Sequence, residues 1–268
     1  MLITSRDIIR RMMQVDLQYT IERMAVIAAR PGNPFGIEVK TFDGATALLA
    51  RKLPSPRFNR VVGLDPAQVD LVATIHEWYA SNDVKPRFEV RPEEFSPALG
   101  HALAGLGYFH SGFHASLYGP VACEYAPARD VTIRHVTTAE EMERFLDVYV
   151  TGWDLPEQIR EPAKSNMRGW LDQRNWFLYQ ALVGSEPAAV AMLYMHDGIG
   201  YFADATVHPA FRGRHIQGAL LAHRWEAAAN MGAELVYSQA EYNSASYHNL
   251  ERAGMRLLHT QAEWTALG

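Results

Sequence analysis

A short basic loop, Arg212-Gly213-Arg214, carries residue types suited to binding phosphate. The mostly apolar run 199–207 before it predicts a strand, and the run 216–231 after it predicts a helix. The first amides of a helix have no partner within the helix and its dipole is positive there, so this end attracts anions. Gly213 lets a ligand approach the backbone, and the two arginines add positive charge. A basic surface turn is the alternative interpretation of this loop on its own.

A second segment, Asn243–Met255, follows one predicted strand later. Together the two segments resemble the GNAT superfamily, the acetyl-CoA-dependent N-acyltransferases. The family loop reads Arg/Gln-x-x-Gly-x-Gly/Ala after a strand that ends in Val-x-Pro, and Val207-x-Pro209 followed by the basic loop is similar to it. The chain departs from this pattern at His215 and Gln217, which stand where the family has its loop glycines. The resemblance covers about residues 130–264.

The resemblance implies an acetyl-CoA site. The backbone amides of the loop and the following helix start would hold the pyrophosphate: Arg212, Gly213, Arg214, His215, Ile216, Gln217, Gly218 and Ala219. The backbone of Thr206 and Val207 would lie along the pantetheine arm, with an N–H near Val207 polarising the thioester carbonyl. Asn243 would hydrogen-bond the same arm, and Ser246 would contact the sulfur. Without the resemblance, Asn243 is equally well explained as a loop or helix-cap residue.

The resemblance also implies direct attack of an amine on the thioester, which needs a general base and can use a general acid. Asp204 on the motif strand is the first candidate base; by alternation it points away from Ala203 and Ala205. A structural carboxylate paired with an arginine is its alternative role. Glu241, at the end of the next strand, is the second candidate, with a solvated loop residue as its alternative. Many family members carry a tyrosine where this chain has Leu250, so the acid is open and Ser246 is kept as a catalytic candidate.

Patterning of the second half predicts the order β-α-β-β-β-α-β-α-β of the GNAT fold, an α/β (α+β) arrangement with a mixed central sheet flanked by helices. Thr138 and Glu141 have capping-box spacing. The expected strands are 131–136, 176–183, 188–195, 201–207, 234–240 and 255–264, and the expected helices are 138–149, 216–231 and 244–253. The aromatic residues Tyr149, Trp153, Trp170 and Tyr194 are candidates for an acceptor pocket, although most such residues belong to cores.

The first half predicts a similar, degenerate order, so we expect two GNAT-like domains. The expected helices are 11–29, 65–79 and 96–106, and the expected strands are two within 37–52, then 59–64, 87–90 and 113–118. Residues 1–122 would form the first domain and 128–268 the catalytic domain, joined by a proline-containing linker at 119–129. Asp65 stands where the first half would need a phosphate loop, so we expect this half to bind no CoA and to be structural or to form a wall of the substrate cleft.

Composition limits the classes of partner and cofactor that this protein is expected to bind. The 268 residues carry a net charge of −5, which argues against broad nucleic-acid binding. The single cysteine, Cys123, excludes an intrachain disulfide and a cysteine-based zinc site, and we expect no metal. No run reaches the ~18 apolar residues of a membrane span, and the N-terminus has no signal architecture, so a cytoplasmic monomer or homodimer without membrane contact is expected.

The function expected is transfer of an acetyl group from acetyl-CoA, as co-substrate, to a small-molecule or peptide amine. A non-catalytic acyl-CoA-binding module on a GNAT frame is the alternative, favoured by His215 and by Leu250. A tandem enzyme that transfers a larger acyl group is a second alternative.

Overall fold

The computed structural model describes residues 5–53, 55–122 and 130–267, and the chain divides into two compact units. Unit 1 comprises Met1–Tyr19 and Ser116–Leu258, and unit 2 comprises Thr20–Ala115 and His259–Gly268. These bounds differ from the halves 1–122 and 128–268, which stay a prediction. Residues 123–129 of the expected linker, with Cys123, lie outside the described residues. Gly119 and Pro120, at the start of that linker, belong to a strand instead.

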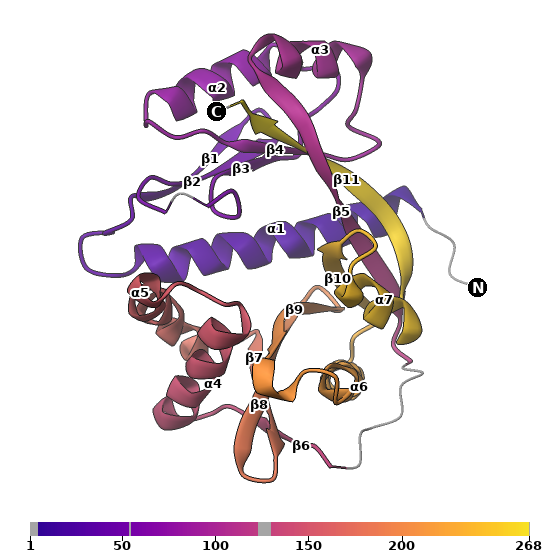
Figure 1. Ribbon diagram of the computed structural model, residues 1–268. Coiled ribbons are helices and arrows are strands. Elements are labelled where there is room, and N and C mark those ends of the chain that lie inside the picture. The colour runs from indigo at the N-terminus through magenta and orange to yellow at the C-terminus, as the bar shows by residue number, and fades with distance from the viewer. Residues whose placement is uncertain (1–4, 54, 123–129, 268) are drawn as a thin grey trace. The chain divides into compact units, whose positions relative to one another are not determined.

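Unit 1 contains a mixed sheet with helices on both faces. Its elements are the first part of α1 (Arg6–Ala28), the end of β5 (Tyr108–Pro120), β6 (Thr132–His135), α4 (Ala139–Gly152), α5 (Glu157–Met167), the 3-10 helix η1 (Arg168–Asp172), β7 (Trp176–Val183), β8 (Glu186–His196), β9 (Ile199–Val207), η2 (Pro209–Phe211), α6 (Ile216–Asn230), β10 (Leu235–Glu241), α7 (Ala245–Arg252) and the start of β11 (Arg256–Ala266). Its strands lie in the order β5-β10-β9-β8-β7-β6. Helices α4 and α6 pack on opposite sides of β8 and β9 (Figure 1).

Local sequence explains where the main helices of unit 1 begin. At α4 the Thr138 side chain accepts from the Glu141 amide while Glu141 reaches back to the Thr138 amide, so the predicted capping box is confirmed. At α7 the Ser244 side chain accepts from the amide of Tyr247. Helix α6 ends before Gly232, whose φ of +79° is the left-handed conformation that terminates helices.

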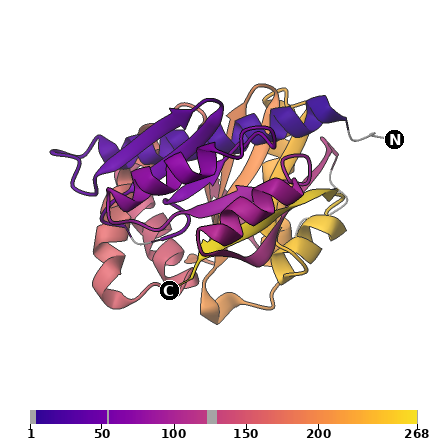
Figure 2. The ribbon, with the colours of Figure 1, turned by 90° about the horizontal axis from the view of Figure 1, so that it is seen from above.

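Unit 2 contains the rest of α1, β1 (Ile37–Phe42), β2 (Ala45–Ala50), β3 (Arg60–Val62), α2 (Leu71–Ala80), β4 (Arg87–Val90), α3 (Pro97–Gly105), most of β5 and most of β11. The strand order is β1-β2-β3-β4-β11-β5. Helices α2 and α3 cover one face of this sheet (Figure 2), where Val72, Ile75 and Leu103 pack with Phe88. On the other face Met24 and Ile27 of α1 pack against Leu48.

The predicted start of the helix after β3 is wrong. The Asp65 side chain accepts from the amide of Ala67 (2.8 Å), which makes a local turn, and α2 begins only at Leu71. The sequence also failed to predict α5, which begins after Pro156 and contains Pro162.

Each unit includes a strand from the other half of the sequence. The end of β5 lies beside β10 in unit 1, and β11 pairs antiparallel with β4 in unit 2, with Ala262 opposite Val90. Helix α1 likewise contributes to both units. The mixed α/β fold predicted from the sequence is confirmed, and the exchanged strands are what the sequence pattern did not reveal.

Candidate acetyl-CoA site

Strand β9 contains a bulge at Asp204. Ala203 lies opposite Met192 and Thr206 lies opposite Val190, so Asp204 and the residue after it face a single residue of β8. Asp204 has a φ of +43°, in the left-handed region that is costly for a non-glycine residue. The simple alternation expected along this strand therefore does not continue through the bulge.

Two tyrosine hydroxyls hold the Asp204 carboxylate. The hydroxyl of Tyr149, on α4, donates to Oδ1 (2.9 Å), and the hydroxyl of Tyr19, on α1, donates to Oδ2. Asp204 is only 8% exposed, so these two bonds replace water around a buried carboxylate. Asp204 is thus held by α1 and α4, two helices far apart in the sequence of unit 1.

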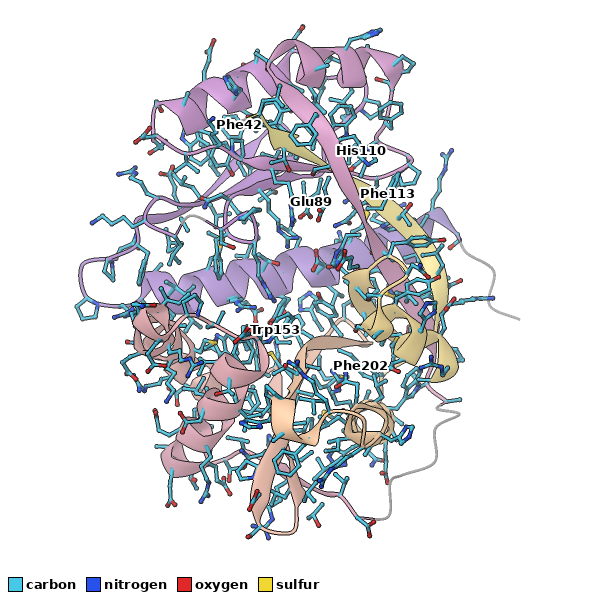
Figure 3. The ribbon with its side chains drawn as sticks, viewed as in Figure 1. Phe42, Glu89, His110, Phe113, Trp153 and Phe202 are labelled. Atoms are coloured by element: carbon cyan, nitrogen blue, oxygen red, sulfur yellow. The ribbon has the colours of Figure 1, made fainter. Side chains whose placement is uncertain are left out.

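Aromatic rings surround the Tyr19 side of this carboxylate. The Tyr19 ring lies 5.0 Å from Trp176, 5.5 Å from Tyr194 and 5.2 Å from Tyr201, centroid to centroid. All four residues are buried. Among the predicted pocket aromatics, Tyr149, Trp170 and Tyr194 are buried in this region, whereas Trp153 at the end of α4 is 47% exposed (Figure 3).

Beyond the bulge, β9 leaves its parallel neighbour β10. Their pairing runs from Leu235 opposite Ile199 to Ser238 opposite Phe202 and goes no further. The Ser238 hydroxyl donates to the carbonyl of Phe202 (2.8 Å), at the last paired position of the two strands. The β10-facing edge of residues 205–207 is therefore available for hydrogen bonds with a strand-like ligand.

The basic loop follows directly. Gly213 has a φ of +79°, and a side chain there would meet nothing within 4 Å. His215 has a φ of +57° and precedes the first residue of α6. Although His215 replaces a family glycine, its backbone adopts the conformation that glycine favours. Among the described residues, the amides from 213 to 217 donate no hydrogen bond to protein, and the left-handed turns make a concavity of N–H groups that suits an anion.

The side chains around the loop have mainly structural contacts. Arg212 donates to the carbonyl of Gly152 at the end of α4 (3.0 Å), and Arg214 lies over the ring of Phe211 (5.4 Å). A side chain at Gly152 would come within 2.4 Å of Thr206 Oγ1, so Thr206 packs closely on α4. Residues 212–215 are exposed, whereas Ile216, Gly218 and Ala219 are buried on the helix and Gln217 is half-buried.

The remaining candidates lie at the end of β10 and the start of α7. Glu241 and Ser246 are exposed, and Asn243 has a φ of +63°. Oδ1 of Asn243 is 3.0 Å from Nε2 of His248, which orients the amide. Leu250 is buried in the core. Because β9 and β10 are parallel, Asp204 and Glu241 lie toward the same end of the sheet, but only Asp204 is buried and bonded there.

Sequence reasoning missed Tyr19. It lies 185 residues from Asp204 on a helix of the first half, and a tyrosine on a helix is ordinarily a core residue. The neighbours of Tyr19 in the sequence include the polar residues Gln18 and Thr20, so its hydroxyl gave no distinct signal.

Comparisons with known proteins concern the family of one segment and the fold of the chain. Residues 142–255 match the family model described as the acetyltransferase (GNAT) family. A solved GCN5-related N-acetyltransferase from Kribbella flavida is similar over 96% of this chain and 95% of its own, with a TM-score of 0.71 and 17% identity. A tandem GNAT protein from the clavulanic acid biosynthesis pathway is similar over 94% of this chain and 96% of its own, with a TM-score of 0.64 and 15% identity. A search of curated proteins gives no match.

At these identities the structural likeness concerns the fold, which is that of tandem GNAT proteins. The segment 142–255 is similar to the GNAT acetyltransferase family. No helix among the described residues is long and apolar enough to cross a membrane. The described residues also contain no group of three or more His, Cys, Asp or Glu arranged to hold a metal ion.

Proposed function

We propose that this chain is an N-acetyltransferase that moves an acetyl group from acetyl-CoA to a small-molecule or peptide amine. The observation that carries the proposal is the edge of β9 at 205–207, which does not pair with β10, followed by the amides of 213–217. A bound pantetheine amide pairs with a strand edge, and a pyrophosphate pairs with free helix-start amides. The two features follow one another along the chain in the order that such a ligand needs.

The residues fit the co-substrate in both charge and space. Gly213 leaves room against the backbone, and Arg214 supplies positive charge beside it. Asn243, held by His248, is the side chain proposed to bind the pantetheine arm, and Ser246 is the second residue of α7, three residues after Asn243. The co-substrate supplies an activated thioester, and a backbone N–H at the end of β9 would polarise its carbonyl.

Asp204 is the proposed proton acceptor. Its two oxygens accept from the hydroxyls of Tyr19 and Tyr149, so a proton given to either hydroxyl oxygen reaches the carboxylate by exchange along one hydrogen bond. A buried carboxylate also stabilises the positive charge that develops on the attacking nitrogen. Glu241, which is exposed, would interact with an acceptor only through solvent-screened charge.

Thermal unfolding with and without acetyl-CoA tests the site, using wild type, Gly213→Asp and Gly213→Asn. Ligand at ~100 times its dissociation constant adds about 2.7 kcal/mol to the free energy of unfolding. Asparagine and aspartate have the same shape, and both tolerate positive φ, so the pair isolates charge. One negative charge about 6 Å from a diphosphate costs roughly 1–3 kcal/mol, or about 10- to 100-fold in affinity. Equal affinities for the Asp and Asn variants, or no shift in wild type, would remove the proposed site.

Turnover separates an enzyme from a binding module. Release of free thiol from acetyl-CoA, measured over a panel of primary amines, is expected in wild type and lost in Asp204→Asn, which should still bind acetyl-CoA. Binding by wild type without turnover on any amine would favour a non-catalytic acyl-CoA-binding module on the same fold.

We also propose that the first half, 1–122, has no CoA site of its own. The turn after β3 supports this proposal, because Asp65 already accepts the Ala67 amide and places a negative charge there. Calorimetric titration with acetyl-CoA should therefore give one site per chain, and two sites would contradict it.

A further inference from the structure

Arg224 is a buried cation on α6, beneath the β9 bulge. It is 1% exposed, and its guanidinium lies over the ring of Phe202 at 4.8 Å. Phe202 lies between β9 and α6 in Figure 3. Nη1 of Arg224 donates to the carbonyl of Met192 (3.1 Å) and approaches that of Ala203 (3.5 Å), while Nε donates to Leu220 (3.2 Å).

This placement is costly for an arginine. No carboxylate forms an ion pair with Arg224 in the part of the chain that the structure describes. Burial lowers the pKa of Arg224 to about 9, so the guanidinium is still charged at neutral pH. Apolar residues of similar volume commonly replace buried charges without loss of stability, so packing alone does not account for an arginine here.

The carbonyls that Arg224 contacts are those beside the bulge. Met192 and Ala203 form the last regular pair before the extra residue of β9. The Ala203 carbonyl belongs to the peptide group that joins Ala203 to Asp204, so its orientation sets the backbone of Asp204. A donor on that carbonyl therefore favours the left-handed conformation in which Asp204 meets its two tyrosines.

We propose that Arg224 is a positioning residue that holds the β8–β9 bulge, and with it the open edge of β9, in the form that accepts the acyl-pantetheine arm. This inference rests on the proposed function for the identity of the ligand. Arg224 follows His215 by nine residues, about 13 Å along the helix axis. The first residues of α6 would therefore bind the pyrophosphate, while Arg224 in the middle of the same helix contacts the bulge. Without Arg224 the Ala203 carbonyl loses this donor, the bulge opens more often, and the edge of β9 then moves out of position.

A comparison of acetyl-CoA binding with ADP binding distinguishes this positioning role from general stabilisation of the fold. Acetyl-CoA requires both the loop and the open strand edge, whereas ADP carries a pyrophosphate and no pantetheine. Arg224→Met should raise the acetyl-CoA dissociation constant at least 10-fold and change that of ADP less than 2-fold. Its midpoint of unfolding should equal or exceed that of wild type, because a buried charge is removed. Arg256→Met is the matched control, since Arg256 also lies over a ring, that of Tyr118 at 5.0 Å, but comes from β11.

Hydrogen exchange supplies a readout that needs no ligand. Peptides covering residues 199–207 should exchange at least 10-fold faster in Arg224→Met than in wild type, and the peptides of α4 should not change. If Arg224→Met does not fold, the same binding and exchange results are expected of Arg224→Gln, whose side chain is polar but neutral and shorter. Wild-type exchange at 199–207, or equal weakening of acetyl-CoA and ADP, overturns the role of Arg224.

The outcomes also distinguish the two proposals. A wild-type protein that does not bind acetyl-CoA contradicts the proposed function, while the exchange measurement still decides whether Arg224 holds the bulge. Wild-type binding that Arg224→Met retains in full contradicts the role of Arg224 and leaves the proposed function standing.

Discussion

Removal of one hydroxyl, by Tyr19→Phe, tests whether α1 holds the candidate base. The ring contacts of Tyr19, at 5.0–5.5 Å to three aromatic neighbours, remain in the phenylalanine variant. The variant loses the hydroxyl and with it the hydrogen bond to Asp204, which is buried and charge-assisted. Such bonds contribute about 1.5–3 kcal/mol, so the free energy of unfolding should fall by that amount.

The assay is urea unfolding followed by tryptophan fluorescence, in a double-mutant cycle with Asp204→Ala. When the carboxylate is absent, the Tyr19 hydroxyl has lost this acceptor, and Tyr19→Phe should then be neutral or stabilising. Tyr149→Phe should behave in the same way through the other oxygen (2.9 Å). The reasoning is refuted if Tyr19→Phe costs less than about 0.5 kcal/mol, or costs the same in both backgrounds.

Three further changes have expected outcomes in the same unfolding assay. Gly152→Ala should cost about 1–3 kcal/mol, because its Cβ would lie 2.4 Å from Thr206 Oγ1, and Thr206→Ala should recover part of the loss. Thr138→Ala should cost about 1 kcal/mol through the lost cap, and a neutral result would deny the capping box. Burial lowers the pKa of His259 from 6.5 to about 4, so wild type should lose up to ~3 kcal/mol relative to His259→Gln as pH falls from 6.5 to 4; parallel pH curves would contradict this.

Local chemistry made much of the fold predictable. Two strands within 37–52 were predicted, and the two turn residues that join them, Asp43 and Gly44, have the positive φ of a hairpin turn, +43° and +103°. The helix after the basic loop and the cap at Thr138 were likewise predicted from neighbours in sequence. By contrast, α5 was missed because Pro162 inside it and Pro156 before it resemble helix breakers, although a proline in the first turns of a helix loses few hydrogen bonds.

The site was predictable only in part. The positions of the loop and of Asp204 follow from the motif, but the bulge does not, because an alternating strand pattern reads the same with one extra residue. The partners of Asp204 were hidden for a different reason, since Tyr19 meets it across 185 residues. Exchange of strands was hidden because β5 and β11 each follow a short helix, and either strand fits either sheet by local pattern.

Because each unit includes a strand from the other half of the sequence, each unit can be completed only late in biosynthesis. Residues 20–115 emerge from the ribosome well before residues 259–268, yet both belong to unit 2. Until β11 arrives, β4 presents an unpaired edge, the kind of surface at which nascent chains associate wrongly. Unit 1 has the reverse dependence, because its earliest residues, up to Tyr19, wait for the chain that carries Asp204. The protein therefore completes neither unit until β11 has been made, and a chain released before that point lacks a part of both units.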